Sequence, residues 1–217
     1  MFGRRSTVGR TDEQLAFMRA AGLLVAGALA TVADAVADGM TTGALDSLAE
    51  SYIRDHGGVP SFPGVPGYRH TLCTSVNEEI VHGIPGSRVL RDGDLLSVDC
   101  GAIVSGWHGD AALSVFVGGD AAARPEDLRL SRVTEESLWA GIAALRVGGR
   151  LYAVGEAIEE SIVAAGKADG RDYGIVEDYV GHAIGQEMHL DPQIFNLSLI
   201  HISEPTRRTP ISYAVFC

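Results

Sequence analysis

Residues 95–110 read LLSVDCGAIVSGWHGD, and this stretch predicts a β-hairpin that carries two acidic side chains. Strand-forming residues lie on both sides of the Ser-Gly pair at 105–106, which has the length of a two-residue hairpin turn. That turn would place Gly101 opposite Asp110. Because alternate residues of a strand share one face, Asp99 then lies on the same face as Asp110 and is its diagonal neighbour, about 7–8 Å away.

Two interpretations of these acids stay open at this point. Most aspartates are simply solvated, so Asp99 could be a hydrogen-bonded strand acid and Asp110 the end of a turn. Asp99, however, stands within the apolar run SVDCGAIV, where an unpaired carboxylate is costly. The alternative is that both carboxylates reach a pair of metal ions about 3.5–4 Å apart. A turn one residue longer would put the acids on opposite faces and remove this alternative.

The composition predicts one large or two small domains with a core of small aliphatic residues. The chain has 217 residues, of which 46% are hydrophobic and only 6% are aromatic. Its 28 acidic and 17 basic residues give a net charge of −11. That balance argues against a nucleic-acid-binding protein, because such proteins usually present a basic patch.

Cysteine content and hydropathy predict a cytoplasmic protein without a membrane span. The three cysteines, Cys73, Cys100 and Cys217, are odd in number and widely spaced, which is not the pattern of a disulfide framework. The longest apolar run, at 16–36, is interrupted by two charged residues and is not expected to cross a membrane. The N-terminus lacks the ordered regions of a signal peptide.

Helix signals predict two helices before the hairpin. Thr11 and Gln14 match a capping box, which would start a helix running to about residue 37. A threonine at 41 or 42 opens a second helix that ends near Asp55. Residues 72–76 are predicted to form a short strand ahead of the hairpin.

The same order of elements recurs after the hairpin. A linker at 120–127 leads to helices predicted at 129–145 and 152–165, and glycines end both of them. A helix pair followed by strands therefore occurs twice. This recurrence suggests a pseudo-symmetric α+β domain.

The segment 177–191, EDYVGHAIGQEMHLD, places His182 and His189 seven residues apart with glycines between them. Small residues permit close approach of the backbone to a ligand. A single histidine is more often a satisfied polar residue than a ligand, but two of them near a glycine-rich turn, with two acids elsewhere, reduce that preference. The segment lacks the lysine and the spacing of a phosphate-binding loop.

Five groups of residues within 11–195 together resemble the type I methionine aminopeptidases. They are RAAG at 19–22, NE at 77–78 with HGIP at 82–85, DGD at 92–94 leading to Asp99, HGD at 108–110, and GHAIG at 181–185 with MH at 188–189. Each motif is weak alone, whereas their joint order and spacing are specific. The resemblance implies the pita-bread (creatinase/aminopeptidase) fold, an α+β arrangement in which helix pairs related by a pseudo-twofold pack on an antiparallel β-sheet.

The resemblance also implies an activity and a cofactor. Enzymes of this family are cytoplasmic and remove the initiator methionine from nascent polypeptides, whose N-termini this chain could meet at the ribosome; we expect a monomer. Water activated by two divalent metal ions would attack the peptide bond. Asp99 would bind one ion, Asp110 would bridge both, and His182 would complete the ligation of one. Co²⁺, Mn²⁺, Fe²⁺ and Zn²⁺ all suit such ligands.

Further roles carry over to residues that would contact the substrate. His82 and His189 would act in catalysis, because they would touch the scissile amide and the oxyanion that develops on it. Phe62, Tyr68 and Cys73 would line the pocket for the methionine side chain.

The chain departs from the family pattern at two places. The family's usual glycine after the metal-binding histidine is Ala183 here, which would be strained if that position required a positive φ. After Phe195 the family continues with a segment that supplies two glutamate ligands, which we do not recognise here. We therefore predict that 1–10 is a disordered lead, 11–195 part of a catalytic domain and 196–217 a non-native tail, so that the fold is incomplete at the C-terminus and the chain inactive.

Two expectations concern the tail itself. The Glu-Pro pair at 204–205 imitates a ligand motif of the family but follows His189 too closely, so we expect Glu204 not to bind metal. The arginines at 207–208 and Pro210 are expected to interrupt any strand in this segment.

Two other functions were weighed against the metalloaminopeptidase. A non-catalytic relative with the same fold would bind peptides or protein partners and would have lost ligands, which the retained acids and histidines disfavour. A proline-specific peptidase of the same fold is disfavoured because such enzymes usually carry an extra N-terminal domain, for which residues 1–10 leave no room.

Overall fold

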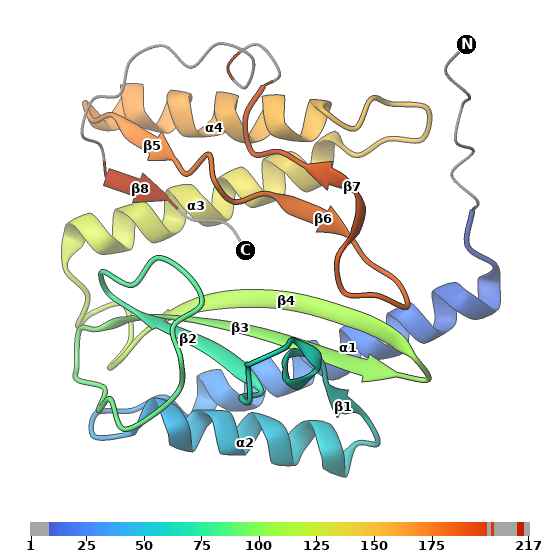
Figure 1. The fold of residues 1–217 in the computed structure, drawn as a ribbon. Helices are drawn as coiled ribbons and strands as arrows, with labels where there is room; N and C mark the ends of the chain where they lie inside the picture. Colours follow the sequence, from blue (N-terminus) through green and yellow to red (C-terminus); the bar gives the residue numbers. More distant parts are fainter. Residues whose placement is uncertain (1–8, 199–200, 202–211, 215–217) are drawn as a thin grey trace.

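Two helix pairs, each followed by strands, build the structure, which is a computed structural model (Figure 1). It describes residues 9–198, 201 and 212–214, so most of the predicted lead at 1–10 and Glu204 lie outside the described residues. The first half contains α1 (Asp12–Ala35), α2 (Thr42–Asp55), β1 (Val59–Pro60), the 3₁₀ turn η1 (Phe62–Gly64), β2 (Leu72–Val76), β3 (Leu95–Val104) and β4 (Trp107–Phe116). The second half contains α3 (Pro125–Ala144), α4 (Ala153–Asp169), β5 (Tyr173–Ile175), β6 (Gly181–Ala183), β7 (Leu190–Ile194) and β8 (Ser212–Ala214).

The predicted hairpin is confirmed with the predicted register. Strands β3 and β4 pair antiparallel, and Gly101 lies opposite Asp110. Ser105 and Gly106 both have positive φ, 51° and 80°, as the two central residues of a hairpin turn with the twist of its strands require. On its other edge β3 pairs with β1 and then with β2, also antiparallel. Figure 1 shows this sheet between the helix pair α1/α2 and the second half of the chain.

One face of the hairpin supplies the main core. Four even-numbered side chains of β3 are buried, and they join α1 and α2 in one apolar cluster: Leu96, Val98, Cys100 and Ala102. Gly109 on β4 faces the backbone of α1, where an added Cβ would lie 2.6 Å from the carbonyl carbon of Ala21. The helix can therefore approach the sheet only because this residue is glycine, and its two neighbours must face the opposite side.

The helix starts agree with the capping signals in the first half and differ in the second. Thr11 and Gln14 form the predicted capping box, and Thr41 caps α2. Helix α3 begins at Pro125, inside the predicted linker, because proline fits the first turn of a helix, where its missing N–H is not needed. Helix α4 runs past the predicted end at Gly166 to Asp169 and ends at Gly170, which is left-handed.

Short strands complete the second half. Strands β6 and β7 pair antiparallel with an irregularity between His182 and Ala183. Strand β8, at Ser212–Ala214, pairs parallel with β5. This strand follows the arginines at 207–208 and Pro210, which lie outside the described residues, so the interruption expected at those positions stays a prediction.

Helix α1 is long and apolar enough to pass a length-and-composition test for crossing a membrane, which core helices of soluble proteins also pass. Its inner face is buried in the main core through Leu24, Val25, Ala28, Leu29 and Val32. The absence of a membrane span stays a prediction.

Candidate functional site

The two hairpin acids occupy the face of the sheet that points away from the main core. Asp110 is the cross-strand partner of Gly101, two residues from Asp99 on β3, so both carboxylates project to the same side. Helix α1 packs against Gly109 on the opposite side, which fixes this orientation. The sequence-based prediction that the two acids share one face is confirmed.

His182, from the second half of the chain, meets Asp110 across this face. Its Nε2 lies 3.5 Å from Asp110 Oδ2. Its Nδ1 lies 3.1 Å from the carbonyl oxygen of Ala183, which can only accept a hydrogen bond, so Nδ1 carries the proton. In the neutral ring the Nε2 lone pair therefore points toward the carboxylate. A backbone carbonyl that fixes the tautomer in this way is typical of histidines that bind metals.

The surroundings of the two acids disfavour their negatively charged forms. Burial raises the pKa of Asp99 to about 7, and the neighbouring Asp110 adds to the shift. Burial also raises the pKa of Asp110, although the histidines around it, His182 first, oppose the change. Asp110 Oδ1 is buried without a hydrogen-bond partner in the described part of the chain. A buried, unpaired carboxylate oxygen is costly and suits a site that binds a cation.

These residues fit a divalent metal ion by their chemistry. Two carboxylates and one imidazole nitrogen are ligands that first-row transition metals accept. Within the described residues, no group of three or more histidine, cysteine, aspartate or glutamate side chains is close enough to hold an ion as it stands. Asp110 and His182 are in direct contact, and Asp99 lies diagonal to Asp110 on the same face of the sheet.

His189 and His108 surround the same carboxylate. The ring centroids of His182 and His189 are 4.5 Å apart in an edge-to-face arrangement. His108 precedes Asp110 by two residues and therefore shares its face; burial lowers the pKa of His108. Its Nδ1 lies 2.9 Å from Ser61 Oγ, and its backbone N–H donates to the carbonyl of Gly185 at 2.8 Å. His108 thus ties the hairpin to the segment between His182 and His189.

His82 lies on the loop after β2 and has a left-handed backbone. Its φ is 59°, a conformation that costs a residue with a Cβ about 1–2 kcal/mol. The next residue must be glycine, because a Cβ on Gly83 would lie 2.2 Å from the carbonyl oxygen of Thr74. The His82 ring packs edge-to-face against Tyr179, with centroids 5.7 Å apart. Such strain at a predicted catalytic residue is typical of functional sites.

The three predicted pocket residues gather beside Asp99. Cys73 on β2 is the cross-strand partner of Asp99, and burial raises its pKa to about 11. Tyr68 donates a hydrogen bond to the carbonyl of Leu72 at 2.6 Å, and its ring lies edge-to-face with Phe62 at 6.3 Å. Burial and a hydrogen bond to Cys73 raise the pKa of the Tyr68 hydroxyl. These aromatic and thiol groups can border a ligand held at Asp99.

Ala183 is not strained at its position. Among the described residues other than glycine, positive φ values occur at Asn77, His82 and Ser105. Ala183 lies in strand β6, where any side chain is accepted. The concern about this alanine therefore does not apply.

Sequence reasoning assigned no role to two residues of the site. His108 could have been found, because it lies two residues from Asp110 on the same strand and must share its face. Tyr179 could not, because its contact with His82 joins loops from the two halves of the chain.

Sequence comparison identifies the family. The profile of metallopeptidase family M24 matches residues 16–211, a span that continues past Phe195. Methionine aminopeptidase 1 of Mycobacterium tuberculosis is 49% identical over 195 residues, which cover 89% of this chain and 72% of that protein. Methionine aminopeptidase 1 of Bacillus subtilis is 42% identical over 185 residues, which cover 85% of this chain and 71% of that protein.

Solved structures agree with this assignment. Methionine aminopeptidase from Rickettsia prowazekii superposes with a TM-score of 0.79 at 33% identity, covering 87% of this chain and 73% of that one. Prolidase from Pyrococcus furiosus superposes with a TM-score of 0.69 at 16% identity, which shows the common fold alone. The predicted pita-bread α+β fold is confirmed. The chain therefore belongs to metallopeptidase family M24 and, within that family, to the methionine aminopeptidases.

Proposed function

We propose that this protein hydrolyses the peptide bond after the initiator methionine of nascent polypeptides. The observation that carries the proposal is the meeting of Asp110 and His182, at 3.5 Å, on the sheet face that also bears Asp99. The methionine aminopeptidases of Mycobacterium tuberculosis and Bacillus subtilis named above support the choice of substrate. Contact with nascent chains at the ribosome, location in the cytoplasm and the monomeric state stay predictions.

Asp99, Asp110 and His182 would hold the metal. Two divalent ions would share Asp110 as a ligand, and Co²⁺, Mn²⁺, Fe²⁺ and Zn²⁺ all accept such oxygen and nitrogen ligands. When bound, such ions lower the pKa of coordinated water and polarise the amide carbonyl. The buried Oδ1 atom of Asp110, which has no hydrogen-bond partner among the described residues, would then have one.

The remaining site residues would bind and orient the substrate. His82 and His189 would each donate a hydrogen bond from an imidazole nitrogen to the scissile amide or its developing oxyanion, an interaction whose loss costs on the order of 10²–10³-fold in rate. Phe62, Tyr68 and Cys73 would surround the thioether side chain with apolar and polarisable groups. His82 has the backbone strain that a preorganised group often carries.

We propose that residues 196–217 supply no metal ligand. The family places two glutamates beyond this point, and Glu204 lies outside the described residues. We therefore compare the 217-residue chain with a hybrid in which the corresponding segment of the Mycobacterium tuberculosis relative replaces 196–217.

The test measures methionine released from a Met-Ala-Ser peptide with added Co²⁺ or Mn²⁺. The hybrid should release methionine, its Asp110→Ala variant should not, and the original chain should be near the metal-only blank. An inactive but folded hybrid would contradict the enzymatic function and favour a peptide-binding relative of the same fold. Full activity of the hybrid Asp110→Ala variant would refute the metal assignment.

A further inference from the structure

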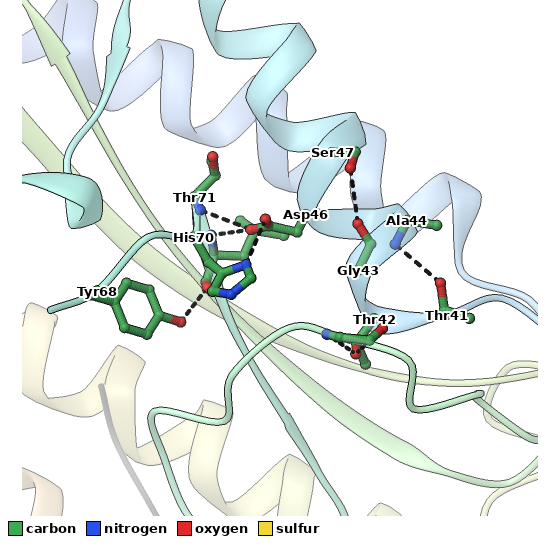
Figure 2. Close-up of polar contacts among 11 residues, drawn as sticks. Thr41, Thr42, Gly43, Ala44, Asp46, Ser47, Tyr68, His70 and Thr71 are labelled. Carbon is green, nitrogen blue, oxygen red and sulfur yellow. Dashed lines mark hydrogen bonds and ion pairs between the residues drawn. The ribbon is translucent and has the colours of Figure 1, made fainter.

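A buried carboxylate on helix α2 holds the backbone just before strand β2. Asp46 is 8% exposed, and its Oδ1 accepts hydrogen bonds from the backbone N–H groups of Thr71 and Leu72, both at 2.8 Å. Its Oδ2 lies 3.2 Å from Nδ1 of His70. Figure 2 shows the Asp46 carboxylate beside Thr71 and His70. Each oxygen of the carboxylate therefore has a donor, and three consecutive residues contact one side chain.

The segment that Asp46 holds carries two of the predicted pocket residues. Tyr68 donates to the carbonyl of Leu72 at 2.6 Å, so the peptide groups on both sides of Leu72 are fixed. The Tyr68 and His70 rings also meet edge-to-face, with centroids 5.8 Å apart. Cys73 follows directly and pairs with Asp99. Any shift of the 70–72 backbone would therefore move both the Tyr68 hydroxyl and the Cys73 thiol relative to Asp99.

The start of α2 is itself a rigid base for this contact. Gly43 donates its backbone N–H to the carbonyl of Gly86 at 2.8 Å, and Thr42 Oγ1 accepts from the Gly86 N–H at 3.0 Å. A Cβ on Gly43 would lie 2.9 Å from the Gly86 carbonyl oxygen, so this close approach requires glycine. Leu45, adjacent to Asp46, is fully buried in the main core.

We propose that Asp46 is a positioning residue for the side-chain pocket, acting through the backbone of residues 70–72 on Tyr68 and Cys73. The inference rests on the proposed function for the identity of the pocket, while the positioning itself concerns this chain's own contacts. A carboxylate suits the task, because bonds from N–H groups to a charged acceptor are shorter and about twice as strong as neutral ones. Asp46 touches neither substrate nor metal in this role.

The first test uses the 217-residue chain and needs no turnover. In Asp46→Ala the amide hydrogens of Thr71 and Leu72 should exchange on the order of 10- to 100-fold faster, which is the contribution of hydrogen bonds to a charged group. Alkylation of Cys73 by iodoacetamide, followed by peptide mass spectrometry, should accelerate as well. Asp46→Asn keeps one oxygen acceptor and should fall between wild type and Asp46→Ala.

The matched control lies one turn further along the same helix. Glu50 pairs with Arg54 on the surface, so Glu50→Ala should leave both exchange and Cys73 alkylation as in wild type. If Asp46→Ala does not fold, Asp46→Asn and His70→Ala provide the same readouts. Wild-type exchange and alkylation rates in the folded Asp46 variants would overturn the proposal.

A second measurement distinguishes a displaced pocket from a general loss of enzyme activity. In the hybrid chain, Asp46→Asn should lower kcat/KM for Met-Ala-Ser more than for Leu-Ala-Ser, because a displaced pocket loses selectivity. Equal loss for both peptides would contradict a role in the pocket. If the wild-type hybrid releases no methionine, the proposed function fails, and the exchange and alkylation results still decide whether Asp46 positions Tyr68 and Cys73.

Discussion

Asp110 Oδ2 on strand β4 lies 3.5 Å from His182 Nε2 on strand β6, so this pair joins side chains from the two halves of the chain. Both partners are oriented by backbone constraints. Gly109 allows helix α1 to pack on one side of the sheet, so Asp110 faces the other side. The carbonyl of Ala183 orients the His182 ring. A preorganised acceptor pair of this kind is what a metal ion requires.

Replacing Leu96 by alanine should destabilise the fold, because Leu96 lies on the hairpin face that packs into the main core. Leu96 is 0% exposed in the main core, so Leu96→Ala should lower the free energy of unfolding by about 2–5 kcal/mol, since it leaves a cavity. Leu23→Ala is the control, because Leu23 is 61% exposed and its loss should change stability by less than about 0.5 kcal/mol. Urea titrations followed by circular dichroism measure both; similar losses would contradict the position of the core.

Gly109→Ala should destabilise the protein because the new Cβ would lie 2.6 Å from the backbone of α1. Gly22→Ala, on the facing helix, has open space at this position and should stabilise by roughly 0.5–1 kcal/mol through helix propensity. Thermal unfolding should therefore shift in opposite directions for the two substitutions. A neutral Gly109→Ala would show that the helix does not pack on the sheet at this residue.

The metal-free protein should lose stability as the pH rises through the acidic range. The folded state holds the Asp99 proton more tightly, with a pKa of about 7 against an ordinary value of 3.8, so the folded chain binds more protons between these values. The stability of wild type relative to Asp99→Asn should then fall from about pH 4 to about pH 7. Denaturant titrations in EDTA across this range measure the difference, and a difference that rises with pH would be opposite in sign to the prediction.

Features that depend on residues close together in the sequence could be predicted, and features that depend on distant segments could not. The hairpin, its turn and the shared face of Asp99 and Asp110 depend on neighbours in the chain, and they could be predicted from residue alternation alone. The start of α3 at Pro125 was misplaced because the acidic and alanine-rich stretch before it resembled a linker. Pro125 at the first helical position was the sequence signal that should have located the start.

Contacts between distant segments could not be predicted in the same way. The meeting of Asp110 with His182 was expected only through the resemblance to a family, since no local pattern joins the two halves. The contact of Asp46 with Thr71 and Leu72 had no sequence signal, because an aspartate in the second turn of a helix is usually solvated. Tertiary packing, rather than local propensity, decides both.

The proposed metal site is tested most directly by the binding of Co²⁺ or Mn²⁺ to the purified chain. Calorimetric titration measures this binding and, for Co²⁺, so does visible absorption. Wild type should bind the ion, and Asp110→Ala and His182→Ala should each weaken binding at least about tenfold, because each removes a ligand. Asp120→Ala and His56→Ala remove an acid and a histidine elsewhere on the surface and should bind as wild type does. Unchanged affinity in Asp110→Ala and His182→Ala would contradict the proposed metal site.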